Sequence, residues 1–374
     1  MKILHVLPSL ATSYGGPVRV ARSMIGYLLN HGHEARIYPF DDEQPKGKLF
    51  MPSRSGLRKL KANVLWADIV HLHGLWNLPT TLAAFFARNS RTPYVVNPHG
   101  MLDSWSLQQS AFVKKIYSLV FERKNLLSAS GLCCTHQEEV DEALKYADFT
   151  NIFILPNGIE VRKFDDLPCR EEMEFVYPQV KEKVVIFFMA RIHYKKGLDK
   201  LVEACSILRE HTNQFHLVIA GEDEGGHLTE IHKLIDKLKL NQFVTFVGEV
   251  LADKKRILMG GADIFALTSH QEGDSISIKE AMASSLPLLI SRQCHYPEFQ
   301  EMGLAKIVST DPFDIALSLK EMVSDRDLRM EMGAKSRSYV EKEVDIEVVN
   351  SVLLEIYSDI LQSRKTSKSW KISE

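Results

Sequence analysis

Short apolar runs alternate with amphipathic stretches along almost the whole chain. The run VVIFFM at residues 184–189 is apolar without a break, which is typical of a strand buried on both faces of a parallel sheet. Alternation of such runs with stretches of helical periodicity predicts a doubly wound α/β architecture. The predicted strands cover residues 3–7, 35–38, 69–72, 94–97, 131–135, 152–155, 184–189, 216–220, 244–247, 264–267 and 288–290.

The predicted strands fall into two series, separated by a polar and irregular stretch between residues 157 and 183. A length of 374 residues also favours two domains of ordinary size. We therefore expect one Rossmann-like domain over residues 1–165 and a second over residues 166–344, facing each other across a cleft. A long helix predicted at about residues 345–361 follows the second sheet and would pack on either domain.

The composition is that of a soluble globular protein, with 45% hydrophobic residues, 25% charged residues and a formal net charge of −2. So small a charge creates no overall field for nucleic acid, and we expect no such partner. No run of 18 or more apolar residues predicts a transmembrane helix, and MKILHVLPSL fits a buried strand better than a signal peptide. The five cysteines form no CxxC pair and are odd in number, which favours reduced thiols in a cytoplasmic protein.

The segment EGDSISIKE, from Glu272 to Glu280, is the strongest local signal. A glycine-containing loop leads directly into a helix predicted at residues 275–285, whose first amides are unpaired and partially positive. One carboxylate lies before the helix start and the other inside it, so together they could hold two polyol groups, such as a sugar and a ribose. A surface loop with a solvated glutamate and a helix salt bridge explains the same spacing.

A second signal is ARIHYKKG at residues 190–197. It follows a predicted strand and precedes a helical stretch, so Arg191 and Lys196 lie where open α/β sheets bind ligands. Two cations beside a helix N-terminus form a diphosphate site without a metal. The alternative is a pair of solvated loop cations.

A third signal is SYGGPVRVA, in the first strand-to-helix turn. Gly15 and Gly16 allow close backbone approach, and the following helix start adds positive potential. This turn does not have the pattern GxGxxG, so the fingerprint of a nicotinamide or flavin enzyme is missing.

Taken in order, these segments resemble the retaining GT-B glycosyltransferases of family 4 along the whole chain. The matching features are the GG turn, a histidine after a mid-domain strand, the PNG turn of the linker, an R-x4-K loop, and an E-x7-E element followed by EAMA. The resemblance implies an N-terminal domain for the acceptor and a C-terminal domain for a nucleotide-sugar donor. It also implies transfer of a hexosyl unit from a UDP or GDP sugar with retention of configuration, and no cofactor, because the nucleotide sugar is a substrate.

The resemblance further implies roles for single residues. Arg191 and Lys196 would hold the donor diphosphate, Glu272 would hold the donor sugar, and His99 in NPHGMLD would lie against that sugar. The remaining donor contacts are implied for Gly15 and Gly16 at the diphosphate, for the backbone of Gly273, Asp274, Ser275 and Ile276 at the sugar, for Glu280 at the ribose, and for Gly248, Glu249 and Val250 near the base.

The stretch PYVVNPHGMLDSW, together with CHYPE at residues 294–298, resembles a branch found among exopolysaccharide and O-antigen assembly enzymes. This implies a glycan or lipid-linked acceptor and a cytoplasmic enzyme in peripheral contact with the inner membrane. Asp103 and His73 are candidates for the acceptor side. Departures from the family pattern are Ala190 and Ser285, which replace glycines, and Asp274–Ser275, which replaces an aromatic-glycine pair and leaves the donor sugar open.

We expect no metal at the site. His71 and His73 in HLHGLW share a strand face, but the sequence offers no third ligand at a sensible spacing. Asp325 and Asp327 form a D-R-D string directly before a helical stretch, which favours helix capping over metal binding.

The segment at residues 110–127 mixes aromatic and aliphatic residues with Lys114, Lys115, Arg123 and Lys124. Such a segment could lie on a membrane surface that bears a lipid-linked acceptor. We expect its apolar residues to pack on the sheet instead, with the basic face left to touch lipid.

Three other functions compete with glycosyl transfer. A GT-B epimerase acting on a nucleotide sugar would need acid and base carboxylates in the cleft and no acceptor. A non-catalytic nucleotide-sugar-binding partner of another transferase would keep the same donor residues. A dinucleotide-dependent oxidoreductase fits the fold class, but the missing GxGxxG pattern counts against it.

Overall fold

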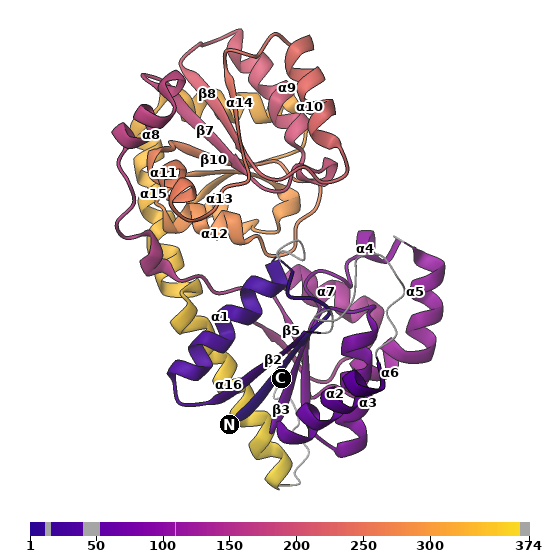
Figure 1. Cartoon of the computed structure of the whole chain (residues 1–374). Coiled ribbons are helices and arrows are strands. Elements are labelled where there is room, and N and C mark those ends of the chain that lie inside the picture. Colours follow the sequence, from indigo (N-terminus) through magenta and orange to yellow (C-terminus); the bar gives the residue numbers. More distant parts are fainter. Residues whose placement is uncertain (12–15, 40–52, 109, 367–374) are drawn as a thin grey trace. The chain divides into compact units, whose positions relative to one another are not determined.

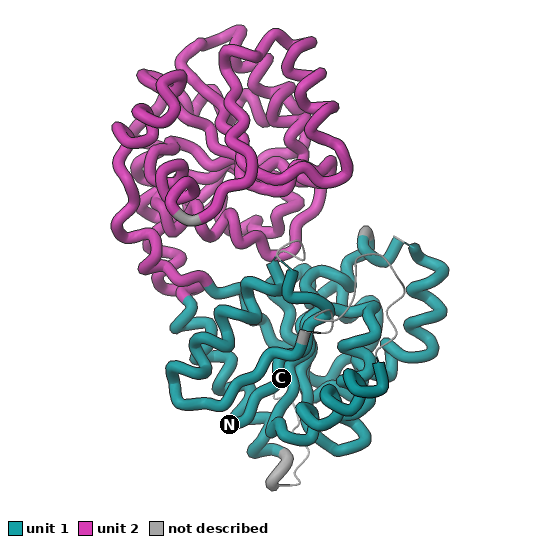
Figure 2. Tube along the Cα trace, in the orientation of Figure 1, with its two compact units in different colours: residues 1–158, 346–374 teal, residues 159–345 magenta. Residues whose placement is uncertain are grey.

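A computed structural model describes residues 1–11, 16–39, 53–108 and 110–366 of the chain. The chain divides into two compact units (Figure 2), of which unit 1 comprises Met1–Gly158 and Ile346–Glu374 and unit 2 comprises Ile159–Asp345. The first boundary falls shortly before the expected residue 165. The C-terminal helix α16 (Ile346–Thr366) belongs to unit 1, where it contacts α1 (Gly16–Asn30).

Unit 1 is built on a six-stranded parallel sheet with the strand order β2-β1-β3-β4-β5-β6. Its direction of winding reverses between β1 and β3, and ligands of doubly wound sheets bind at the carboxyl ends of strands at such a switch point. The strands are β1 (Lys2–Leu7), β2 (Glu34–Pro39), β3 (Ile69–His73), β4 (Tyr94–Asn97), β5 (Gly131–Cys134) and β6 (Ile152–Ile154).

Helices cover both faces of this sheet, because every residue of β3, β4 and β5 is buried. Burial on both faces is typical of the strands of a parallel sheet. Besides α1 and α16 (Figure 1), the helices of unit 1 are α2 (Arg54–Trp66), α3 (Leu78–Ser90), α4 (Ser104–Gln108), α5 (Ala111–Tyr117), the π-helical segment η2 (Ser118–Glu122), α6 (Arg123–Leu127) and α7 (Gln137–Tyr146).

Unit 2 is built on a second six-stranded parallel sheet, with the order β12-β11-β10-β7-β8-β9. Its switch point lies between β7 and β10. The strands are β7 (Val184–Met189), β8 (Phe215–Ala220), β9 (Val244–Gly248), β10 (Ile264–Leu267), β11 (Leu288–Ser291) and β12 (Ala305–Val308). The last strand, β12, was not predicted.

The helices of unit 2 also lie on both faces of their sheet, since all residues of β8, β10 and β11 are buried. Two helices begin at the switch point: α9 (Leu198–Arg209) follows the segment ARIHYKKG, and α12 (Ile276–Ala283) contains the end of the segment EGDSISIKE. The helices are α8 (Arg170–Val176), α9 (Leu198–Arg209), α10 (His227–Lys237), α11 (Ala252–Gly261), α12 (Ile276–Ala283), α13 (Glu298–Glu301), α14 (Pro312–Ser324) and α15 (Arg326–Tyr339).

The segment formed by α5, η2 and α6 contradicts the expectation that its apolar residues pack on the sheet. Phe112 is 76% exposed and Leu119 is 84% exposed. The buried residues of the segment are Glu122, Asn125 and Leu126, of which only Leu126 is apolar and belongs to the hydrophobic core. The apolar side chains that face solvent are Phe112, Val113, Ile116, Leu119, Val120, Phe121 and Leu127.

No helix of the described residues is both long enough and apolar enough to cross a membrane.

Candidate functional site

The loops after β7 and β10 meet at the switch point of unit 2. The first ends in a short 3-10 turn, η5 (Tyr194–Lys196), and Gly197 then begins α9. Gly197 has a φ of 63°, and a Cβ there would lie 2.0 Å from the backbone oxygen of Thr268, so only glycine fits. The Thr268 hydroxyl also donates to the Gly197 oxygen at 2.8 Å. These contacts hold the two loops together.

Lys196 and Glu272 form an ion pair across these loops. Lys196 Nζ donates to Glu272 Oε1 at 2.6 Å, and the Ser269 hydroxyl donates to the same oxygen at 2.5 Å. The Glu272 side chain is only 6% exposed and that of Lys196 is 17% exposed. Within the described part of the chain, both bonds to this carboxylate end on Oε1, so Oε2 is the oxygen left to accept a ligand hydroxyl.

Arg191 has a different carboxylate partner. Its Nη1 lies 2.6 Å from each carboxylate oxygen of Glu224, in the loop after β8. Both side chains are about half exposed, so the pair adds little to stability. The structure therefore pairs the two predicted diphosphate cations with separate carboxylates.

The loop before α12 is pinned by a buried ion pair. The carboxylate of Asp274 accepts hydrogen bonds from Lys279 of α12 and from the Tyr296 hydroxyl. Burial raises the pKa of Tyr296 well above its usual value, so the phenol stays protonated and donates. The Asp274 side chain thus fixes the loop that contains Gly273, Asp274, Ser275 and Ile276, whose backbone is predicted to meet the donor sugar.

Glu280 lies in the middle of α12 and is nearly buried. Lys255 of α11 donates to its Oε1 at 2.6 Å. Near the end of β9, Gly248 and Glu249 are exposed and Val250 is buried. Sequence reasoning did not find Lys255, Ser269, Lys279 or Tyr296, because each meets its partner through the fold rather than through local spacing.

In unit 1, His99 follows β4 and has a left-handed backbone with a φ of 53°. The next residue holds this strained turn, because the Gly100 amide donates to Glu139 Oε1 at 2.6 Å. Glu139 is buried, and its other oxygen accepts from the amide and the hydroxyl of Thr135 at 2.6 and 2.7 Å. Asp103, a candidate for the acceptor side, accepts a hydrogen bond from the Ser106 amide at the start of α4.

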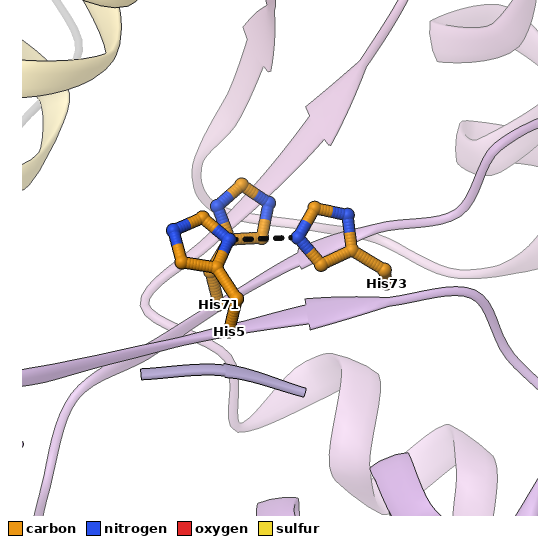
Figure 3. Close-up of side chains that lie close together, drawn as sticks. All are labelled: His5, His71 and His73. Carbon is orange, nitrogen blue, oxygen red and sulfur yellow. Dashed lines mark hydrogen bonds between the residues drawn. The ribbon is translucent and has the colours of Figure 1, made fainter. Parts of the chain in front are cut away.

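Three buried histidines come together at the β1/β3 switch point (Figure 3). His5 of β1 lies opposite His71 of β3 in the strand register, and His73 lies two residues further along β3. Spacing along the sequence showed no third ligand for the HLHGLW pair, and His5 reaches that pair through strand pairing instead. His73, a candidate for the acceptor side, is fully buried in this cluster.

The histidine cluster is electrically neutral. Burial lowers the pKa of His5 to about 3 and holds the pKa values of His71 and His73 well below 6.5. His71 Nδ1 lies 2.6 Å from the hydroxyl of Tyr357, which anchors α16 to the sheet.

Two remaining predictions lie elsewhere. Asp325 accepts from the Leu328 amide at the start of α15, which confirms that the D-R-D string caps a helix. Gly16 is the first residue of α1, and Gly15 lies outside the described residues.

Comparison with known proteins assigns a domain family to each unit. Residues 15–158 match the glycosyl transferase 4-like domain, and residues 170–339 match the glycosyl transferases group 1 domain. In structure, the chain is similar to HepE from Anabaena, solved with UDP and glucose, with a TM-score of 0.77 and 18% identity over 96% of this chain and all of that one. At this identity the likeness shows the fold, which is GT-B.

Two curated relatives are more similar in sequence. A GDP-mannose-dependent alpha-(1-6)-phosphatidylinositol monomannoside mannosyltransferase from Mycobacterium tuberculosis is 28% identical over 196 residues, half of each chain. The D-inositol 3-phosphate glycosyltransferase of Corynebacterium jeikeium is 27% identical over 311 residues, 71% of this chain and 74% of its own length. The match thus spans about half the length of the first relative. The chain is thus similar to a glycosyl transferase 4-like domain over residues 15–158 and to a glycosyl transferases group 1 domain over residues 170–339.

Proposed function

We propose that the protein is a retaining glycosyltransferase that moves a hexosyl unit from a UDP or GDP sugar to a glycan or lipid-linked acceptor in surface polysaccharide synthesis. The observation that carries this proposal is the Lys196–Glu272 pair at the β7/β10 switch point. It sets a cation and a carboxylate side by side, each nearly buried, at the edge of the sheet where nucleotides bind.

In this proposal the two charges act on different parts of the donor. Lys196 faces the diphosphate, where negative charge grows as the bond to the anomeric carbon breaks, and a fixed cation is most effective there. Arg191 joins it after leaving Glu224. Glu272 Oε2 accepts a hydroxyl of the sugar, the backbone of residues 273–276 lies along that sugar, and Glu280 takes the ribose. Gly248, Glu249 and Val250 serve the base, and the family resemblance also assigns Gly15, Gly16 and His99 to the donor.

The proposed reaction needs no protein nucleophile. The bond from the anomeric carbon to the diphosphate oxygen breaks, and the acceptor oxygen forms a bond on the same face. The acceptor proton passes to the leaving phosphate oxygen. We propose no obligatory metal or cofactor, so activity is expected to survive a chelator.

Turnover of two variants tests the proposal. Lys196→Ala and Glu272→Ala are expected to lower the rate by at least about 10²–10³, as for the loss of one fixed charge-stabilising group. Lys306→Ala is the matched control, because Lys306 forms an exposed pair with Glu321 in the same unit. Near-native turnover in either site variant would defeat the assignment. Product analysis with the donor alone separates transfer from epimerisation, and an inactive wild type that still binds donor would favour the non-catalytic partner.

We also propose that unit 1 meets the lipid-linked acceptor at an anionic membrane surface. Residues 112, 113, 116, 119 and 120 have the spacing of one helix face, and this apolar face of the α5–η2–α6 segment points to solvent. Lys115, Arg123 and Lys124 are exposed beside it, whereas the acidic residue of the segment, Glu122, is buried. An exposed apolar face flanked by basic side chains suits a bilayer that carries negative charge.

Flotation with vesicles tests this contact. The protein is expected to float with vesicles containing anionic lipid and less with neutral ones, and Phe112→Ser/Leu119→Ser is expected to release it. Phe175→Ser is the control, because Phe175 is 88% exposed on α8 of unit 2. Equal binding by the double variant would contradict the contact, as would a wild-type dimer that the double variant dissociates.

A further inference from the structure

Three imidazole rings form a continuous hydrogen-bonded chain in unit 1. His5 Nδ1 lies 2.9 Å from His73 Nε2, and His73 Nδ1 lies 3.1 Å from His99 Nε2. His5 and His73 are fully buried, whereas His99 is half-buried at the end of β4. The chain thus leads from the β1/β3 switch point outward to the residue expected at the donor sugar.

Because the buried rings are neutral, each has a fixed number of hydrogen-bond donors and acceptors. A neutral imidazole has one N–H and one lone pair, so a ring bonded through both nitrogens donates with one and accepts with the other. His73 is such a ring, and burial keeps it neutral. The ring nitrogen of His73 that carries the proton therefore sets the donor-to-acceptor direction of both hydrogen bonds in this histidine chain.

His5, at the inner end of this histidine chain, determines which hydrogen-bond direction is favoured. His5 Nε2 is buried and has no hydrogen-bond partner among the described residues. If His99 donated inward, His5 Nε2 would carry an N–H with no acceptor, and buried orphan donors are rarer than buried under-used acceptors. The favoured direction runs outward, from His5 Nδ1–H to His73 Nε2 and from His73 Nδ1–H to His99 Nε2.

We propose that His73 is a positioning residue that fixes the tautomer and ring orientation of His99. His99 then accepts through Nε2 and carries its proton on Nδ1. Glu139 fixes the backbone of the same residue by binding the Gly100 amide. The consequence for catalysis rests on the proposed function, in which His99 lies against the donor sugar, whereas the tautomer itself does not.

The same cluster does not suit a metal ion. The rings of His71 and His73 are stacked, with centroids 4.4 Å apart and planes within 7° of each other. Their nitrogen lone pairs therefore lie in two parallel planes and cannot point at a common ion. His5 and His73 already share a hydrogen bond at the point where their nitrogens meet.

Nitrogen-15 NMR of histidine-labelled full-length protein tests the tautomer directly. In the wild type, the His99 signals are expected to show a protonated Nδ1 and an accepting Nε2. His73→Phe keeps a ring but removes both bonds, so His99 is expected to become a mixture of tautomers, and His73→Asn, which keeps an N–H donor, is expected to restore the wild-type pattern in part. His71→Phe is the control, because His71 stacks on the cluster but lies outside the chain. A protonated Nε2 in the wild type would overturn the proposal, as would zinc-induced shifts of all three buried rings.

Kinetics separate this proposal from the proposed function. His73→Phe is expected to lower kcat roughly 10–100-fold, as loss of an outer partner of a functional histidine does elsewhere, with the donor KM unchanged. Thermal unfolding of each variant checks the fold. If the NMR pattern holds and kcat does not change, the tautomer assignment stands and the role of His99 in transfer fails. If His99 keeps its tautomer in His73→Phe, the positioning role fails.

Discussion

Lys196 Nζ donates to Glu272 Oε1 at 2.6 Å, although the two residues are 76 positions apart in the sequence. They meet because β7 and β10 are neighbours in the sheet and the loops that follow them leave its carboxyl edge together. The pair is held before any donor arrives, since Ser269 and the Thr268–Gly197 contact fix the two loops. In the proposed function, a donor diphosphate therefore meets a cation that is already in place, which is the condition for efficient electrostatic stabilisation.

Releasing Arg191 from its exposed partner is expected to strengthen donor binding. In Glu224→Gln the guanidinium loses a charged competitor for the diphosphate, so the donor KM falls by up to about fivefold, in line with an exposed pair worth up to about 1 kcal/mol. The free energy of unfolding changes by less than about 1 kcal/mol for the same reason. Steady-state kinetics with varied donor measures the effect, and an increase in KM would show that Glu224 itself serves the donor.

Breaking the buried Asp274–Lys279 pair is expected to destabilise unit 2. Lys279→Met leaves a buried carboxylate without its cation and lowers the free energy of unfolding by about 3–5 kcal/mol. Asp274→Asn/Lys279→Met removes both charges and recovers most of that loss. Thermal unfolding of the two variants beside Lys306→Ala measures this. A single variant as stable as the wild type would mean that the pair is not buried in solution.

The buried histidines are expected to make unit 1 sensitive to acid. The folded pKa values of His5, His71 and His73 lie below the unfolded value of 6.5, so the unfolded chain binds more protons below that pH. Their contribution to stability is complete above pH 6.5 and decreases as the pH falls below that value, by at most about 1.4 kcal/mol per pH unit for each histidine. Glu122 has the opposite effect on stability: burial raises its pKa to about 7, so its contribution to the free energy of unfolding increases as the pH falls from 7 to 4.5.

Urea unfolding followed by tryptophan fluorescence isolates this effect, because Trp66, Trp76 and Trp105 belong to unit 1 and residues 159–345 of unit 2 contain no tryptophan. The stability difference between the wild type and His5→Phe is expected to shrink by about 1.4 kcal/mol per pH unit below pH 6.5. A difference that stays constant between pH 7 and pH 5 would show that His5 titrates normally in the folded protein.

Local pattern predicted much of the fold. The unbroken run VVIFFM marked β7 to the residue, and the D-R-D string marked the cap of α15. The strand β12 was missed because the polar Lys306 interrupts a run of only four residues. The outward apolar face of the α5–η2–α6 segment was also misjudged, because helical periodicity shows that a face exists but not which side of the helix the sheet covers.

Sequence patterns indicated which residues are candidates for the site, but not which residues they contact. Spacing singled out Lys196 and Glu272, and strand order brought them together. No local signal joins Glu280 to Lys255 or Tyr296 to Asp274, because these contacts depend on tertiary packing. The meeting of His5 with His73 likewise depends on β1 lying next to β3 rather than next to another strand.

Calorimetric titration with UDP, GDP and their sugars tests the role of the Lys196–Glu272 pair most directly. The account predicts that one of the two nucleoside diphosphates binds the wild type and Lys306→Ala equally, and binds Lys196→Ala at least about tenfold more weakly, as expected for a lost charge-assisted bond. Glu272→Gln is expected to bind that diphosphate at least as well as the wild type, because Lys196 is released, but to gain no affinity from the attached sugar. Equal binding of the diphosphate by the wild type and Lys196→Ala would contradict the account.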